Sequence, residues 1–420
     1  MPDEPRTLSA PRGTRDLLPP ESWEWHEVLA VALETFAGAG YAPIETPIFE
    51  HTEVFERGVG ETSEVVGKQM YTFTDRGGRS LTLRPEGTAP VMRAVLEHNL
   101  HRGSLPIKLS YAGPMFRQER PQKGRYRQFF QVGIEAIGTD DPRADAEVIE
   151  VGTRFYRAAG VETKLSLNSI GHVDPSCRQG YMKVLTEFLE ANVASLAAED
   201  RERVGTNPLR TFDSKEPATV KVMQDAPVII DHLCAGCREH FVAVRGLLDD
   251  VGVAYEIQPR LVRGLDYYTR TAFEWVATGL GSQDAVGGGG RYDGLSESLG
   301  GPPLPGIGIA PGIDRILLAR SASGTKAGGV VVYVVALGEA ASRVAFKLVT
   351  ELRGKGIGAD LDLMDRSMKG QMKDASRSGA RWAVILGDEE LAANNASLKD
   401  LDSGEQEMVG LDELHERVAP

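Results

Sequence analysis

Residues 128–137 alternate between apolar and polar side chains, which predicts a β-strand, and residues 107–116 also have the pattern of a strand. The segment between them contains Pro121 and Gly124, both common in turns. We therefore predict a long antiparallel hairpin. A shorter hairpin is predicted over residues 70–83, and its facing apolar residues are Tyr71 and Phe73 on one strand and Leu81 and Leu83 on the other.

Apolar residues at helix-like intervals predict a helix over residues 20–38, which glycines then end. Residues 41–49 are extended, and their two prolines exclude a central position in a sheet. Residues 172–252 are mostly helical in pattern and read as an insertion. The other elements predicted before residue 320 are helices at 88–98 and 143–159, strands at 163–168, 254–258 and 271–276, strand signals just before Gly287–Gly290, and a final strand and helix within 306–319.

Residues 321–329 are small and polar, which predicts a linker. The continuous apolar run at 330–337 is typical of a buried parallel strand. A helix at 339–354, a strand at 359–363, a helix at 367–379 and a strand at 382–386 follow. The expected fold class is α/β: an α+β domain on a mainly antiparallel sheet at residues 1–325, with a helical insertion at about 172–252, and an α/β domain with a mixed sheet at 326–420.

The composition, with 41% hydrophobic and 25% charged residues in 420, is ordinary for a soluble globular protein. No window approaches the roughly 18 apolar residues that a membrane span needs. The N-terminus lacks the features of a signal peptide, and an odd count of 3 cysteines argues against a disulfide framework. We therefore expect a cytoplasmic protein.

Cys234-Ala-Gly-Cys237, followed by His240, resembles half of a zinc site. Zinc sites usually show two spaced ligand pairs, and the second pair is missing here unless His232 joins. We therefore expect no metal, and interpret Cys234 and Cys237 as buried or weakly redox-active thiols on a helix.

The loop of the long hairpin is basic, although the chain as a whole carries a net charge of −13. Residues 102–127 contain seven Lys or Arg and a single acid, Glu119, so their local charge is +6. One interpretation is a solvated basic loop. Because two strands fix the loop, and because the fork of Arg117 can grip phosphate oxygens, we favour a site for an anionic partner.

Four further segments carry residues suited to binding an anion, although each alone could be structural. None is a Walker loop or a dinucleotide-binding glycine motif. Arg315 falls in the first turns of a predicted helix, where anions are favoured. The segments are Leu81–Thr88, Leu261–Trp275, Gly287–Gly294 and Gly306–Arg315.

Taken in order, these segments resemble a class II aminoacyl-tRNA synthetase. Phe116-Arg-x-Glu119 is similar to the second signature of that class, Gly312–Arg315 to the third, and the region of Gly40–Pro47 to the first, dimer-forming one. Two departures lie in the third signature, where Asp314 replaces the usual Glu and Pro311 a small residue. The segments that resemble histidyl-tRNA synthetases in particular are Leu83–Thr88, Leu261–Tyr268 and Gly289–Gly294, and the likeness extends from Pro11–Asp16 to the C-terminal domain.

This resemblance implies ATP-dependent activation of L-histidine to histidyl-adenylate and transfer of histidine to the 3′ end of tRNA(His) by a homodimer, with Mg²⁺ accompanying the ATP. It implies that Arg117 grips the α-phosphate, Arg315 the γ-phosphate, and that Arg263 bridges the substrate carboxylate and the α-phosphate. The other implied site residues are Glu86, Gly87, Thr88, Gln131, Glu135, Tyr267 and Tyr268 for histidine, Glu119 for ATP, and Gln122 for the tRNA acceptor end.

Glu135 and Tyr268 are expected to read the imidazole, because one can accept and the other can donate a hydrogen bond. An alternative to the synthetase is the regulatory subunit of ATP phosphoribosyltransferase, which shares the catalytic fold but charges no tRNA and typically lacks the C-terminal domain. Another alternative is a general RNA-binding module. Residues 366–381 hold five Lys or Arg against one Asp, a local charge of +4, which favours an anticodon reader over a solvated helix face.

Overall fold

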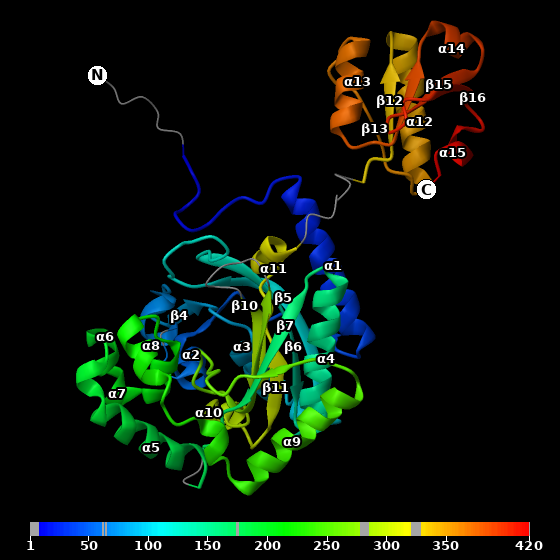
Figure 1. Cartoon of the computed structure of the whole chain (residues 1–420). Coiled ribbons are helices and arrows are strands. Elements are labelled where there is room, and N and C mark those ends of the chain that lie inside the picture. The colour runs from blue at the N-terminus through cyan, green and yellow to red at the C-terminus, as the bar shows by residue number, and fades with distance from the viewer. Residues whose placement is uncertain are drawn as a thin grey trace, which may run out of the picture. The chain divides into compact units, whose positions relative to one another are not determined.

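The computed structural model describes residues 8–60, 63, 65–173, 176–277, 285–320 and 329–419. The chain divides into two compact units, one formed by residues 1–16 with 25–321 and the other by residues 17–24 with 322–420 (Figure 1). The linker predicted at 321–329 falls almost entirely outside the described residues. No helix in the described part of the chain is long and apolar enough to cross a membrane.

An eight-stranded sheet forms the centre of the larger unit. Its two terminal pairs are parallel and the pairs between them are antiparallel, which confirms the mainly antiparallel sheet predicted from the sequence. The strands, in sheet order, are β1 (Ala42–Pro43), β5 (Ile107–Phe116), β6 (Gln128–Ile137), β11 (Gly306–Ile309), β10 (Ala285–Arg291), β9 (Thr269–Ala277), β7 (Thr163–Ser169) and β8 (Glu256–Ile257).

The long hairpin has the predicted bounds, since β5 and β6 pair without interruption from Ile107 opposite Ile137 to Phe116 opposite Gln128. The proline-bearing strand β1 lies at the sheet edge, as expected for a residue that cannot donate a backbone hydrogen bond. The second hairpin also has the predicted register, with Tyr71 opposite Leu83. It belongs to a three-stranded sheet of β2 (Phe49–His51), β4 (Ser80–Leu83) and β3 (Tyr71–Thr74).

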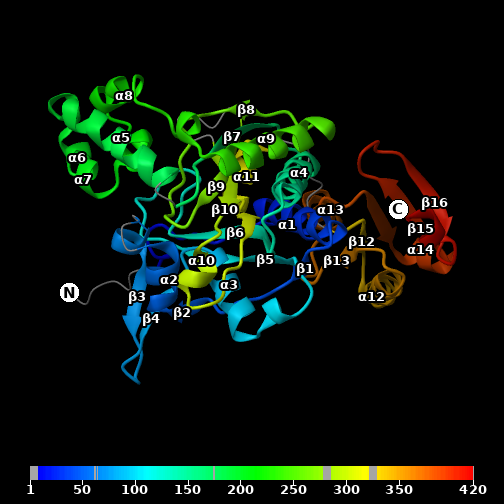
Figure 2. The ribbon, with the colours of Figure 1, turned by 90° about the horizontal axis from the view of Figure 1, so that it is seen from below.

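Helices cover both faces of the large sheet, with α4 (Pro142–Ala158) on one face and α3 (Thr88–Glu97) on the other (Figures 1 and 2). On the α4 side, Phe155 packs in a core with Trp275 of β9 and Ile309 of β11. This core also receives the buried side of α1 (Glu21–Gly38). The other helices that accompany the sheet are α2 (Thr52–Val59), the π-helix Val65–Gln69, the 3₁₀ turn Leu100–Arg102, α10 (Leu295–Ser298) and α11 (Ile313–Ala319).

In the region predicted as a helical insertion, the elements that the structure describes are helices and short 3₁₀ turns. Its last helix packs against the α4 side of the sheet through apolar residues such as Phe241 and Leu248. The elements are α5 (Arg178–Ala191), α6 (Ala198–Arg201), α7 (Arg203–Thr206), α8 (Pro217–Met223) and α9 (Ala235–Asp250), with 3₁₀ turns at Val193–Ser195, Pro208–Asp213 and Ile229–His232.

The smaller unit has a five-stranded mixed sheet, as predicted. Its apolar strand β12 (Val332–Ala336) is buried on both faces. Val334 packs in a core with α12 (Glu339–Gly354), while Val335 packs in a second core with Ala375 of α13 (Met368–Arg377). In sheet order the strands are β13 (Ala359–Leu361), β12 (Val332–Ala336), β14 (Trp382–Leu386), β15 (Asn395–Asp400) and β16 (Gln406–Gly410), and the helices are α12 (Glu339–Gly354), α13 (Met368–Arg377), α14 (Asp388–Ala392) and α15 (Leu414–Arg417).

The glycine run is where the sequence prediction and the structure differ. We predicted a strand before Gly287–Gly290, but residues 278–284 lie outside the described part of the chain and the run itself forms the middle of β10. Glycine is depleted in strands, so the pattern concealed this one. Side chains are absent here because other groups occupy the space that a Cβ would need, as the site below shows.

Candidate active site

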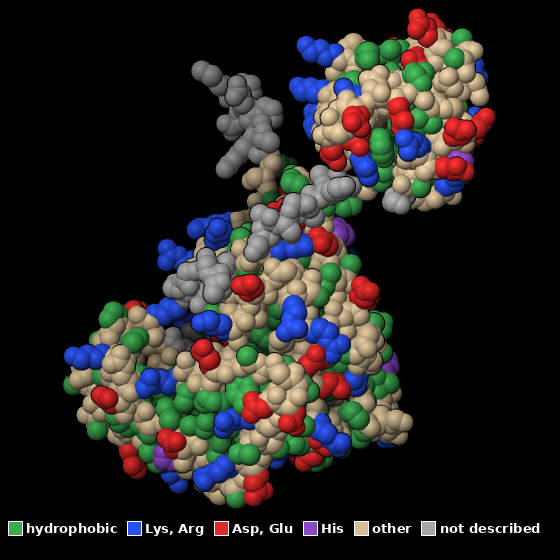
Figure 3. Space-filling view, turned by 45° about the vertical axis from the view of Figure 1, so that its right-hand side comes forward, with side chains coloured by type: hydrophobic (Ala, Val, Ile, Leu, Met, Phe, Trp, Pro, Cys, Tyr) green, Lys and Arg blue, Asp and Glu red, His purple; other side chains and the backbone are tan. Residues whose placement is uncertain are grey.

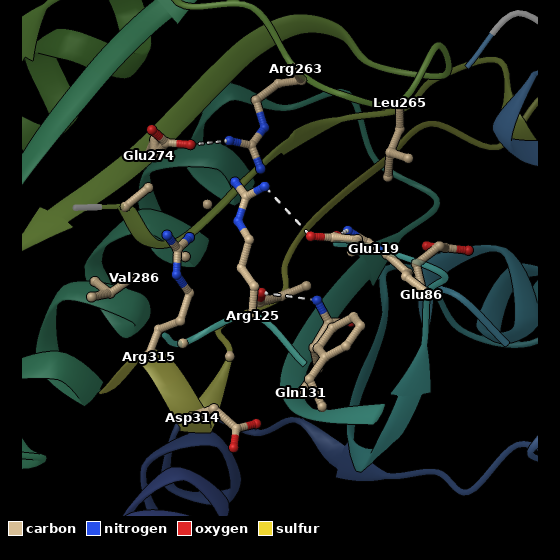
Figure 4. A pocket seen from close by; sticks show the side chains of 18 of the residues that line it. Glu86, Glu119, Arg125, Gln131, Arg263, Leu265, Glu274, Val286, Asp314 and Arg315 are labelled. Atoms are coloured by element: carbon tan, nitrogen blue, oxygen red, sulfur yellow. Dashed lines mark hydrogen bonds and ion pairs between the residues drawn. The ribbon is translucent and has the colours of Figure 1, made fainter. Parts of the chain in front are cut away.

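One cavity of the larger unit gathers most of the residues predicted to bind substrate (Figure 4). Its walls come from the start of α3, the β5–β6 hairpin, the segment before β9, the strand β10 and the start of α11. The predicted residues that line it are Glu86, Thr88, Arg117, Glu119, Gln131, Arg263, Tyr267, Tyr268 and Arg315, and Asp314 of the third signature lines it as well. Segments far apart in sequence therefore meet at one place.

Arginines from separate segments converge on this cavity. Figure 4 shows the side chains of Arg125, Arg263 and Arg315 directed toward the same space. Arg125 belongs to the basic hairpin loop, and no local pattern distinguishes it from the other basic residues there. Its Nη1 lies 3.5 Å from an oxygen of Glu119. A cavity lined by so many guanidinium groups is suited to a ligand with several negative charges.

Arg117 is fixed at the cavity wall by its own neighbours. Its Nε donates to the Pro85 carbonyl at 2.9 Å, and its guanidinium carbon lies 5.2 Å from the centre of the Phe129 ring. Its Nη1 is 3.8 Å from Glu119, a looser contact. The backbone hydrogen bond and the ring therefore set the direction of the guanidinium before any ligand arrives.

Arg263 is held between a carboxylate and an aromatic ring. Its Nη1 donates to Glu274 at 2.8 Å, and its guanidinium carbon lies 5.5 Å from the centre of the Tyr268 ring. A Cβ on Gly288 of β10 would come within 2.7 Å of Nη1. The absence of a side chain at Gly288 therefore leaves room for the Arg263 guanidinium to lie against the sheet.

Glu86 lies at the beginning of α3 and is 3% exposed. Its two oxygens accept hydrogen bonds from the backbone N–H groups of Thr88 and Ala89, at 2.8 and 2.9 Å, and one of them also accepts from the Tyr267 hydroxyl at 3.2 Å. Burial raises the pKa of Glu86, and these hydrogen bonds oppose the rise. The result is an acceptor group oriented by a helix N-terminus at the cavity wall.

Gln131 offers a second acceptor to the cavity. Its amide nitrogen lies 3.5 Å from the Ala310 carbonyl, while its buried Oε1 has no hydrogen-bond partner among the described residues. A buried acceptor without a partner costs free energy unless a ligand supplies a donor. Gln131 is therefore prepared to receive a cationic or N–H group.

Glu135 lies behind the cavity wall and not on it. Its carboxylate is fully buried and accepts from the hydroxyl groups of Thr88 and Tyr292, at 2.7 and 2.5 Å. A Cβ on Gly308 would come within 1.8 Å of its Oε2. Glu135 is therefore linked to the cavity through Thr88, which lines it together with Tyr268. Contact between Glu135 and an imidazole stays a prediction.

Two further predicted residues do not line the cavity. Gly87 precedes α3, and a Cβ there would lie 2.5 Å from the Tyr111 ring, so its role is to let the helix begin close to β5. Gln122 is exposed in the hairpin loop. Its contact with the acceptor end of tRNA stays a prediction.

The two residues that depart from the third signature, Asp314 and Pro311, both make hydrogen bonds to the β5–β6 hairpin. Asp314 accepts from Arg15 Nη2 at 2.9 Å and from the backbone N–H of Phe130 at 3.1 Å, so this acid joins the N-terminal segment to β6. The carbonyl of Pro311 accepts from the backbone N–H of Val132 at 3.0 Å. Both residues therefore hold α11, and with it Arg315, against the hairpin.

Sequence reasoning missed the role of Arg291 in the glycine-rich segment, which we expected to approach a ligand. Arg291 is fully buried and donates to Asp145 of α4 through Nε and Nη2, at 2.9 and 2.6 Å. His240 of α9 lies 3.0 Å from the same carboxylate. This part of the motif therefore fastens β10 to two helices.

The burial of Glu135 predicts a pH-dependent stability. Burial raises its pKa to about 8 from 4.5, so the folded state keeps a proton that the unfolded chain releases between these values. The free energy of unfolding should therefore fall from about pH 5 to about pH 8, by at most ~1.4 kcal/mol per pH unit from this group. Urea denaturation across this range should show a shallower fall for Glu135→Gln, whereas the control Glu97→Gln should follow the wild type. An unchanged slope in Glu135→Gln would contradict the prediction.

Comparison with known proteins identifies the family. The family model described as histidyl-tRNA synthetase matches residues 13–316, and the model described as anticodon binding domain matches residues 331–419. The chain is 51% identical over 411 residues to the histidine--tRNA ligase of Corynebacterium urealyticum, covering 97% of this chain and 95% of the relative. It is also 51% identical over 412 residues to that of Nocardia farcinica, covering 97% of both.

Solved structures agree with these sequence matches. The apo histidyl-tRNA synthetase of S. aureus superposes with a TM-score of 0.80 at 39% identity, covering 98% of this chain and 100% of the other. The chain therefore belongs to the histidyl-tRNA synthetase family.

Proposed function

We propose that this protein activates L-histidine with ATP to form histidyl-adenylate and then transfers histidine to the 3′ end of tRNA(His). The observation that carries this proposal is the convergence of Arg117, Arg263 and Arg315 on a cavity that also presents the acceptors Glu86 and Gln131. Membership of the family supports it. The protein would act in the cytoplasm.

In the first step the histidine carboxylate attacks the α-phosphorus of ATP and pyrophosphate leaves. Negative charge grows on the phosphoryl oxygens, so catalysis rests on positioning and on cationic groups. Arg117 would grip the α-phosphate, Arg263 would bridge the carboxylate and the α-phosphate, and Arg315 would hold the γ-phosphate. In the second step a ribose hydroxyl at the tRNA 3′ end attacks the adenylate carbonyl, the bond from this carbonyl to the phosphate breaks and AMP leaves, so no side-chain nucleophile is needed.

Histidine recognition would divide between two sets of groups. The α-ammonium is a donor only, and Glu86, Thr88 and Gln131 offer acceptors at the cavity wall. Tyr268 would donate to the acceptor nitrogen of the imidazole. Glu135 would accept from the ring N–H once the Thr88 hydroxyl turns away from it, which would match the donor and the acceptor of one ring tautomer.

Mg²⁺ would enter together with ATP. Mg²⁺ is bound by oxygen, usually through one or two carboxylates, phosphates and water. Glu119 and Glu274 line the cavity and fit this donor set, and Glu119 contacts its neighbouring arginines only at 3.8 and 3.5 Å. The ion would neutralise charge on the phosphates, while the arginines orient them.

ATP–pyrophosphate exchange tests the proposed function, and we expect exchange that depends on histidine. Arg263→Ala should slow it about 100- to 1000-fold, because the loss of one electrostatic contact to the transition state costs about 3–4 kcal/mol. Arg57→Ala is the control and should leave exchange unchanged, since Arg57 forms an exposed pair with Glu53. Exchange without histidine, or with another amino acid instead, would overturn the assignment. A regulatory subunit or an RNA-binding module would show no exchange.

We propose that the smaller unit reads the anticodon. Lys and Arg side chains project from one edge of this unit (Figure 3). The structure lowers the charge that we expected near α13, because two acids outside residues 366–381 lie against it: Arg366 pairs with Asp362, and Arg381 lies 3.5 Å from Asp400. Lys369 and Lys373, one turn apart on α13, form no ion pair with any described residue and remain available for phosphate.

Removing the smaller unit should separate the two steps. A chain without residues 326–420 should retain measurable histidine-dependent exchange but lose tRNA charging, because phosphate contacts alone do not discriminate between sequences and the anticodon bases need a pocket. The measurement is charging of tRNA(His) alongside exchange, with circular dichroism to establish that the shortened protein is folded. Equal charging by the shortened and full-length chains would refute the proposal.

We also propose a homodimer formed through residues of roughly 20–50. Phe49 of β2 and Phe73 of β3 are 50% and 44% exposed and their rings lie 6.4 Å apart, and Leu33 of α1 is 41% exposed. Exposed apolar groups of this kind mark interaction surfaces. Sedimentation at micromolar concentration should therefore give a dimer. Phe49→Asp should shift the population toward monomer, whereas Phe346→Asp, which changes the 64% exposed Phe346 of α12, should not. A monomeric wild type would contradict this.

A further inference from the structure

The sequence showed only two members of a cluster that the structure completes. Cys234 and Cys237 lie at the beginning of α9, where the sequence suggested half of a zinc site. The structure adds His172 and Cys177 from the beginning of the insertion, and the ligand atoms of all four residues lie within 4.8 Å of one another. Neither His232 nor His240 belongs to this cluster.

We propose that His172, Cys177, Cys234 and Cys237 bind one Zn²⁺ ion that fastens the helical insertion to the catalytic sheet. This reverses the expectation of no metal drawn from the sequence. Structural zinc sites are four-coordinate and tetrahedral, and a set of three Cys and one His is among their usual ligand sets. Nothing in the active site depends on this ion for its chemistry, since it lies outside the cavity lining.

The distances fit a tetrahedral site. With Zn–S about 2.3 Å and Zn–N about 2.0–2.1 Å, the edges of a tetrahedron are roughly 3.5–3.8 Å. The His172 Nδ1 atom lies 3.0 Å from Cys237 Sγ and 3.7 Å from Cys234 Sγ. An ion at the centre requires the His172–Cys237 pair to open by about 0.5 Å and a pair at the limit of 4.8 Å to close by about 1 Å, shifts within the reach of side-chain rotation.

The surroundings are those of a closed site. Cys177 and Cys237 are 1% and 2% exposed and belong to an apolar cluster with Ile170 and Leu233. The backbone N–H of Cys237 points to Cys234 Sγ at 3.4 Å, and Cys234 caps the N-terminus of α9. A thiolate is favoured by a helix N-terminus and by such a donor. The apolar shell would keep the ion from exchanging with solvent.

Neither alternative use of these residues accounts for the whole cluster. A disulfide would engage two sulfurs and leave the third beside the imidazole, and disulfides are rare in a reducing cytoplasm. Among inert buried thiols, a hydrogen bond from one thiol would account for the imidazole nitrogen at 3.0 Å, but not for the gathering of all four ligand atoms within 4.8 Å. A metal uses all four groups at once.

The position of the cluster indicates which segments the ion would hold together. His172 follows β7, Cys177 leads into α5, and the other two cysteines begin α9, so the ion would join both ends of the insertion to the sheet. Arg178, next to Cys177, donates to the Tyr268 carbonyl at 2.7 Å. Loss of the ion would therefore loosen the segment that carries Tyr268 into the histidine site.

Metal analysis of the full-length protein tests the proposal directly. Protein purified without chelators should contain about one zinc per chain. His172→Gln and Cys237→Ser should each lose it, whereas His232→Gln, which removes a neighbouring histidine outside the cluster, should retain it. His172→Cys should also retain zinc, because a fourth thiolate is an equally suitable ligand. Cobalt in place of zinc should give the visible bands of tetrahedral cobalt and a near-ultraviolet band from sulfur ligation.

Several results would overturn the proposal. These are protein that contains no zinc and takes up neither zinc nor cobalt, a disulfide among the three cysteines in the isolated protein, or full zinc content in a folded His172→Gln variant.

The second readout is kinetic and rests on the proposed function. His172→Gln should raise the KM for histidine in exchange more than the KM for ATP. If His172→Gln lost zinc but kept the kinetics of the wild type, the metal site would stand and its effect on the Tyr268 segment would be refuted.

Discussion

The groups in and behind the arginine-lined cavity depend on the absence of a side chain at two positions on neighbouring strands, Gly288 of β10 and Gly308 of β11. A Cβ at Gly288 would collide with the guanidinium of Arg263, and one at Gly308 would collide with the carboxylate of Glu135. The first glycine allows a guanidinium, and the second a carboxyl group that keeps its proton up to about pH 8, to lie directly against the centre of a sheet, where the dielectric is low. Burial of a polar group is costly without partners, and here Arg263 donates to Glu274 while Glu135 accepts from Thr88 and Tyr292.

A second set of buried charges holds this sheet in place. Arg291 and Asp145 are both fully buried, and they join β10 to α4, with His240 of α9 on the same carboxylate. Such pairs contribute little net stability compared with apolar groups, but the loss of either partner is costly. Their effect is geometric, because they fix the register of the helices on the sheet. Because Cys234 and Cys237 stand at the start of α9 and His240 lies about one turn further on, the ion pair and the proposed metal site both anchor the first turns of this helix.

The sequence predicted what short-range patterns determine and missed what tertiary contacts determine. The hairpin of β5 and β6 was predicted to the residue because alternation and turn residues are local signals. The strands β15 and β16 were not predicted, and β10 was concealed by its glycines. The convergence of the arginines followed from resemblance, whereas the contacts of Asp314, the burial of Arg291 and the proximity of His172 to Cys237 join segments distant in sequence. No local pattern contains those pairings.

The ion pair between Arg15 and Asp314 has a consequence for synthesis of the protein on the ribosome. Its partners are 299 positions apart, near the two ends of the larger unit, and the Gly13 carbonyl also accepts from the backbone of Arg127 in the hairpin loop. At about 5–20 residues per second, this first segment must wait roughly 15–60 s for α11 to emerge. A nascent chain therefore cannot complete the arginine-lined cavity early, and must first synthesise almost all of the larger unit.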